Sequence, residues 1–196
     1  MRRRTFDIIV SSVGAVLVVV LLAAGALAMW GYSFANNSVR DQLVAQQIYF
    51  PPAGSDALKP PEIGNYLNQY AGQQLTTGAQ AEAYADHFIA VHLSEVAGGQ
   101  TYAQVSAAAM ADPTNTKLQG QVATLFKGET LRGLLLNAYA FWKVGQIALY
   151  AGITAFAGAA VMLVLTALGF WHLRRVNTEQ EVFAGKPTPR PVAATA

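Results

Sequence analysis

The fold of this chain is decided by the uncharged stretch IIVSSVGAVLVVVLLAAGALAMW, Ile8 to Trp30. A helix needs roughly 20 apolar residues to cross about 30 Å of hydrocarbon, because it rises about 1.5 Å per residue. A second uncharged stretch, GQIALYAGITAFAGAAVMLVLTALGFW (Gly145 to Trp171), meets the same requirement. We therefore expect an all-α membrane protein with two transmembrane helices, 8–30 and 145–171, and a small helical external domain between them.

The first stretch has the outline of a signal peptide. RRRTF precedes it, and Ala26–Ala28 resembles a cleavage site. However, its apolar run is well beyond the roughly 7–15 residues of a signal-peptide core. We interpret it as an uncleaved anchor.

Basic residues at the two ends predict the topology. Arg2–Arg4 precede the first span, and Arg174 and Arg175 follow the second. Positive residues beside a span stay on the cytoplasmic side, and two spans return the chain to the side on which it began. We expect a multi-pass protein of the plasma membrane with a cytoplasmic N-terminus (1–7) and a cytoplasmic tail (172–196). The Pro- and Ala-rich end of that tail is expected to be disordered.

The segment between the spans, 31–144, is the expected external domain, and its apolar spacing and breakers predict helices. The four predicted helices are one that starts at the Asn37–Ser38 capping signal and stops before Pro51, one over 77–96 that ends at Gly98–Gly99, one that follows the Thr101–Gln104 capping box and ends at Asp112–Pro113, and one that starts near 114 and continues into the second span. No alternating pattern typical of strands competes with them.

The composition excludes several functions. The chain has no cysteine, which rules out iron–sulfur clusters, c-type haem attachment and blue-copper sites. Neither span contains an ionisable residue, so transport by this chain alone is disfavoured. The net charge of +2 is explained mostly by the topology signal, and nothing in the sequence indicates a nucleic-acid partner. We expect no cofactor.

DHFIAVHLSE, Asp86 to Glu95, is the stretch that most resembles a metal site. An iron site of two histidines and one carboxylate needs three converging ligands. His87 and His92 are five residues apart, whereas side chains on a regular helix stack at a spacing of four. His92 with Glu95 supplies two ligands at most. We favour the polar face of an ordinary helix, and the alternative is an external metal-dependent oxygenase that uses His87, His92 and Glu95.

Several residues near the outer ends of the spans have the character of contact residues. Aromatic rings settle at the membrane interface, amide side chains can hydrogen-bond a neighbouring helix, and small residues at a spacing of four let helices approach closely. The candidate contacts with a partner or with lipid are Trp30, Tyr32, Phe34, Asn137, Trp142, Gln146, Ala151, Ala155 and Ala159.

The wording and order of these segments resemble a known family. The segments are the Arg-rich start, GYSFANNSVRDQLVAQQIYFPP after the first span, and YADHFIAVHLSEVAGGQTYAQVS before the second. The chain is similar from Arg2 to about Arg175 to a group of actinobacterial two-span membrane proteins. Members are often labelled aromatic ring-opening dioxygenases, and the group includes the prokaryotic respiratory supercomplex association factor.

The resemblance implies a non-catalytic accessory subunit of the actinobacterial respiratory supercomplex. Its partners would be subunits of the cytochrome bcc complex (complex III) and of the aa3-type cytochrome c oxidase (complex IV), together with membrane lipids. The dioxygenase label gains no support from the residues, because no converging ligand set is found. Besides the oxygenase alternative, a scaffold protein of the cell envelope remains open.

Overall fold

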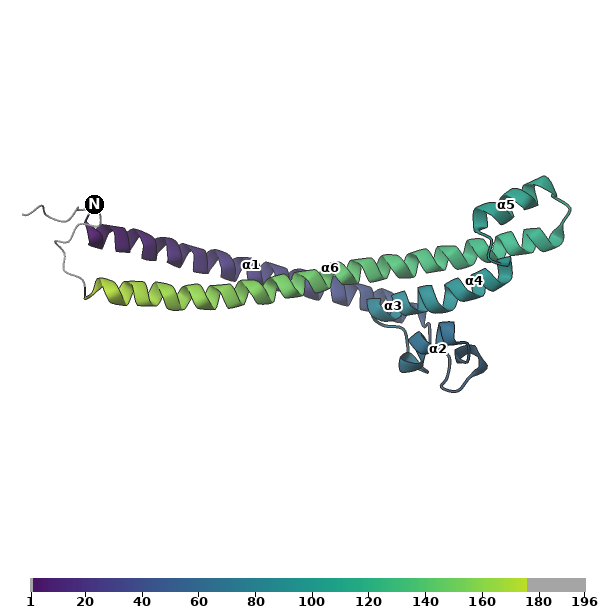
Figure 1. Cartoon of the computed structure of the whole chain (residues 1–196), viewed down its shortest axis with the longest axis horizontal. Coiled ribbons are helices and arrows are strands. Elements are labelled where there is room, and N and C mark those ends of the chain that lie inside the picture. Colours follow the sequence, from purple (N-terminus) through teal and green to yellow (C-terminus); the bar gives the residue numbers. More distant parts are fainter. Residues whose placement is uncertain (1, 176–196) are drawn as a thin grey trace, which may run out of the picture. The chain divides into compact units, whose positions relative to one another are not determined.

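The computed structural model describes residues 2–175 as an almost entirely helical chain. The predicted disordered end of the tail, 176–196, lies outside the described residues. Two helices are long and apolar enough to cross a membrane, α1 (Arg3–Gln46) and α6 (Thr116–Leu173) (Figure 1). The chain divides into two compact units, and each long helix contributes to both. Unit 1 holds the chain up to Ala28 and from Tyr150 onward, and unit 2 holds Met29–Leu149.

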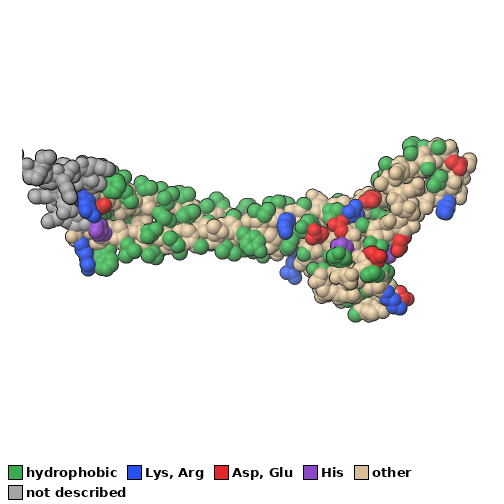
Figure 2. All heavy atoms as spheres, viewed as in Figure 1, with side chains coloured by type: hydrophobic (Ala, Val, Ile, Leu, Met, Phe, Trp, Pro, Cys, Tyr) green, Lys and Arg blue, Asp and Glu red, His purple; other side chains and the backbone are tan. Residues whose placement is uncertain are grey.

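Unit 1 is an antiparallel pair formed by the start of α1 and the end of α6 (Figure 1). The less exposed residues of α6 in this unit are 152, 155, 158, 159, 162, 166, 169 and 173. All of them except 158 follow the three-and-four spacing of a coiled-coil seam. Small residues let the backbones approach across this seam, since a Cβ added to Gly14 would lie 2.5 Å from Thr166 Oγ1. The exposed side chains of this unit are largely hydrophobic beyond the charged residues near the start of α1 and the end of α6 (Figure 2).

Unit 2 places a set of short helices against the end of α1 and the start of α6. They are the 3-10 turns η1 (Asp56–Leu58) and η2 (Asn68–Tyr70), α2 (Pro61–Leu67), α3 (Gly78–Tyr84), the π-helical turn η3 (Ala85–Ile89), α4 (Ala90–Ala97) and α5 (Tyr102–Ala111). Among the described residues, the β-type pairing is a single bridge between Tyr49 and Gln74. The all-α prediction for this region is confirmed.

Local signals set most of the helix ends. Thr77 and Thr101 begin α3 and α5 with complete capping boxes to Gln80 and Gln104. Gly98 ends α4 in the left-handed conformation, with φ of 60°, which glycine adopts without a steric penalty. These three boundaries confirm the prediction from the sequence.

The predicted helix start at Asn37–Ser38 is wrong, because α1 runs without a break from Arg3 to Gln46. Ser38 does not cap a helix there. Its hydroxyl instead accepts a hydrogen bond from Gln42 Nε2, one turn later, at 3.3 Å. A capping residue is only a local preference, and the apolar packing of Val39 and Leu43 into unit 2 favours the continuous helix.

The core of unit 2 gathers apolar side chains from almost every helix around the inner faces of α1 and α6. The largest side chains that are completely buried belong to Leu67, Leu75, Leu125 and Val105. Each buried side chain of this size contributes about 1.5–3 kcal/mol relative to its exposed state. The short helices are therefore held against α1 and α6 by apolar burial.

Candidate functional site

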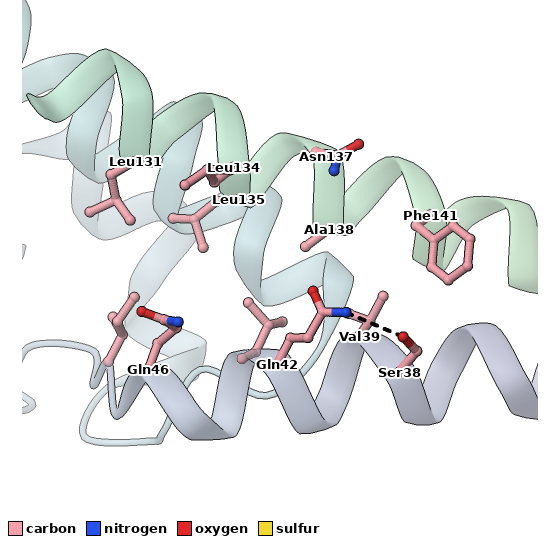
Figure 3. A pocket seen from close by; sticks show the side chains of 12 residues that line it. Ser38, Val39, Gln42, Gln46, Leu131, Leu134, Leu135, Asn137, Ala138 and Phe141 are labelled. Atoms are coloured by element: carbon pink, nitrogen blue, oxygen red, sulfur yellow. Dashed lines mark hydrogen bonds between the residues drawn. The ribbon is translucent and has the colours of Figure 1, made fainter. Parts of the chain in front are cut away.

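A groove between α1 and α6 in unit 2 is the candidate interaction site (Figure 3). Its volume is about 420 Å³, within the roughly 300–1,000 Å³ typical of binding pockets. Twelve residues line it, and none carries a charge: Ser38, Val39, Gln42, Leu43, Gln46, Ile48, Leu131, Leu134, Leu135, Asn137, Ala138 and Phe141. Val39, Leu43 and Leu135 also belong to the core, so the floor of the groove is firmly fixed.

An aromatic cluster continues the apolar surface of this groove. Trp30 stacks on Phe34 with ring centroids 5.8 Å apart, and Phe34 meets Phe141 edge to face at 6.3 Å. Trp30 is 68% exposed and Phe34 is 56% exposed. Because Phe141 also lines the groove, the rings and the groove form one uncharged surface. Exposed apolar patches of this kind mark interaction sites.

The other predicted contact residues of unit 2 differ from one another in exposure. Asn137 is exposed and lines the groove, while Tyr32 and Gln146 are half-buried. Trp142 packs inward, because a Cβ added to Gly78 at the start of α3 would lie 2.5 Å from its Cγ. Trp142 therefore holds α3 against α6, a contact inside unit 2 that the interface pattern alone does not distinguish from an external one.

The three alanines predicted to form one helix face are divided by the structure. In unit 1, Ala159 is 2% exposed against α1, Ala155 is half-buried and Ala151 is exposed. The helix pair follows the three-and-four spacing of a coiled coil, and a row with a constant spacing of four drifts away from that seam. Ala159 is thus occupied by a contact within the pair.

The histidines of DHFIAVHLSE lie in and next to a π-helical turn. Ala85 O accepts the Ala90 N–H, which closes a five-residue turn. His87 stacks face to face on Tyr66 of α2, with centroids 3.5 Å apart. His92 Nδ1 donates to Phe88 O at 2.7 Å. Within residues 2–175, no three His, Cys, Asp or Glu side chains gather closely enough to hold a metal ion, so His87, His92 and Glu95 do not form one site.

The carboxylate of Asp86 faces α6, where Arg132 donates to its Oδ1 at 2.9 Å. Arg132 also reaches Glu129 Oε2 at 3.5 Å. The hydrogen bond that Arg132 donates to Asp86, more than any other cause, raises the pKa of Arg132 above its usual value. The pair is about one-third exposed, and such pairs contribute at most about 1 kcal/mol. The pair joins the π-helical turn to α6.

Sequence reasoning identified Asn137 but missed most of the other residues that line the groove. Leu131, Leu134, Ala138 and Phe141 stand at spacings of three and four on the helix predicted to start near 114. Ser38, Gln42 and Gln46 stand at a spacing of four on the helix predicted before Pro51. These two stripes were readable from the sequence. Their meeting across one groove depends on tertiary packing.

No family model, curated protein or solved structure was found to match this chain.

Proposed function

We propose that this chain is a two-span protein of the plasma membrane and a non-catalytic accessory subunit of the actinobacterial respiratory supercomplex. α1 crosses the membrane over 8–30 and α6 over 145–171, and both termini are cytoplasmic. Unit 2 then lies outside the membrane, beside the outer faces of the cytochrome bcc complex and the aa3-type oxidase. The uncharged, ordered stretches and the flanking arginines support this topology.

One observation carries the docking role. The groove and the Trp30–Phe34–Phe141 cluster give unit 2 an exposed, uncharged surface built on a fixed core. Protein interfaces have such a character at their centres, where charged residues are depleted and aromatic residues are enriched. The identity of the partners is supported by the family resemblance of the segments on either side of the spans.

The test is purification of the affinity-tagged full chain from membranes in a mild detergent. Reduced-minus-oxidised spectra of the eluate measure the a-, b- and c-type haems that accompany it. We expect all three haem types in a fixed ratio to the tagged chain. A tagged two-span protein of similar abundance is the control. An eluate without haem contradicts the proposal, and an eluate enriched instead in cell-wall enzymes indicates an envelope scaffold.

A further inference from the structure

The α6 wall of the groove repeats the pattern of a helix-packing seam. Leu131, Leu134, Ala138 and Phe141 follow one another at spacings of three, four and three. Leu134 is 63% exposed, although this row lies beside the buried core residue Leu135. The same alternation of three and four defines the seam of coiled coils, in which a side chain of one helix enters a hole formed by another.

The α1 wall is polar but uncharged. Ser38, Gln42 and Gln46 lie at a spacing of four, and Asn137 adds a further amide from the side of α6. Figure 3 shows the three α1 side chains along the groove, with Gln42 Nε2 donating to Ser38 Oγ at 3.3 Å. The occupant of the groove must therefore meet an apolar row on one side and hydrogen-bonding groups on the other.

We propose that the groove binds one α-helix of a partner protein, which packs as a third helix against α1 and α6. Each wall spans 11 residues or fewer, so the contact extends over about 15 Å, or about three helical turns. The contacting stripe of the partner helix has apolar side chains at three-and-four spacing and an uncharged polar side chain opposite Gln42 and Gln46. The inference rests on the proposed docking role and assigns a site to it.

The lining favours this occupant over others. A lipid chain has no hydrogen-bonding group. It would bury the amides of Gln46 and Asn137 without supplying a partner, which is unfavourable. A charged helix face would lose its hydration against twelve uncharged residues and find no counter-charge. A helix that offers neutral polar groups beside an apolar row satisfies both walls, as in other helix-in-groove complexes.

The absence of cysteine from the sequence permits a direct test. Single cysteines replace Gln42, Leu134 or, as the control outside the groove, Met110 on α5 in the full chain. Each is coupled to a benzophenone maleimide, the membranes are illuminated, and cross-linked peptides are identified by mass spectrometry. We expect both groove positions to label one helix of one partner protein at residues three, four or seven apart. Cross-links to lipid, to a second copy of this chain or to none of these overturn the proposal, as does the same labelled helix from Met110.

A second measurement separates this inference from the proposed function. Leu134→Glu places a charge in the groove, and Met110→Glu places one at a site that is 73% exposed; circular dichroism checks that both variants fold. We expect Leu134→Glu to lower the haem recovered per chain by more than about tenfold, because the new charge is buried without a partner, and Met110→Glu to leave it unchanged. Normal haem recovery with Leu134→Glu overturns the groove assignment while the proposed function stands. A partner helix cross-linked without any haem supports the groove and contradicts the supercomplex.

Discussion

Gly78→Ala tests how closely α3 packs against α6. The added Cβ would lie 2.5 Å from Trp142 Cγ and 2.9 Å from Cδ2, and closer still to Trp142 Cβ. Favourable carbon contacts lie at about 3.5–4.0 Å. Rotation of the indole cannot move its own Cβ, so α3 and α6 must separate by about 1 Å if they are to regain contact distances.

Two effects of opposite sign then compete. Overpacking a fixed contact costs about 1–3 kcal/mol. Alanine in place of glycine returns at most about 1 kcal/mol of helix propensity, and less at the first residue of a helix. We expect Gly78→Ala to lower the free energy needed to open α3 by about 1 kcal/mol or more. Gly120→Ala on α6 is the matched control, since its Cβ meets nothing within 4 Å, and it should gain about 0.5–1 kcal/mol.

Hydrogen exchange measures both variants in the full chain in detergent micelles. The exchange rates of the α3 amides report the opening of that helix, and those near 120 report the start of α6. Faster exchange in α3 for Gly78→Ala, with slower exchange near 120 for Gly120→Ala, is the expected pair of results. Equal or slower exchange of α3 in Gly78→Ala would refute the close approach of Gly78 to Trp142.

Three further results are expected. In unit 1, the double variant Gly14→Cys with Thr166→Cys should form a disulfide under mild oxidation. The two Cβ atoms lie 3.6 Å apart, within the range of about 3.5–4.5 Å found in disulfides. Gel mobility detects the disulfide, and equal cross-linking by Val13→Cys with Thr166→Cys would contradict the pairing. Burial raises the pKa of Tyr84 above its ordinary value of 10.0, so the folded state favours the neutral phenol. The stability that this preference gives the fold is complete below pH 10 and is lost as the pH rises through the higher pKa of the folded state. Hydrogen exchange of the α3 amides should accelerate in that pH range, and Tyr84→Phe should reduce the acceleration. Leu75→Ala removes a completely buried side chain and should cost about 2–5 kcal/mol in thermal or denaturant unfolding of unit 2, so an unchanged midpoint would show that Leu75 is not in the core.

Much of the helical architecture follows from local chemistry in the sequence. The uncharged runs predict two long apolar helices, because only a helix satisfies its own backbone groups in hydrocarbon. The capping box at Thr101–Gln104 and the left-handed glycine at Gly98 set helix ends through neighbouring atoms, and the structure has both. Signals of this kind depend on a few consecutive residues, so no knowledge of packing is needed to read them.

The candidate site depended on packing. Asn37–Ser38 looks like a helix start, but α1 continues through it because Val39 and Leu43 pack into the core. From the sequence, Trp142 looks like a ring at the membrane interface. In the structure it packs inward against Gly78, because a residue without a side chain leaves room for the indole. His87 and His92 look like a pair, but the ring of His87 stacks on Tyr66 of α2, whereas His92 donates to Phe88 O.

The sequence by itself determined that two apolar helices flank a small helical region, because hydrophobicity and caps act along the chain. Only the tertiary structure decided which side chains those helices leave uncovered. Ala159 is taken up by contact with α1, whereas Leu134 and Asn137 remain open beside Gln42. Residues about 90 positions apart in the chain form that groove, and their meeting is fixed by the way two helices pack, which no local pattern encodes.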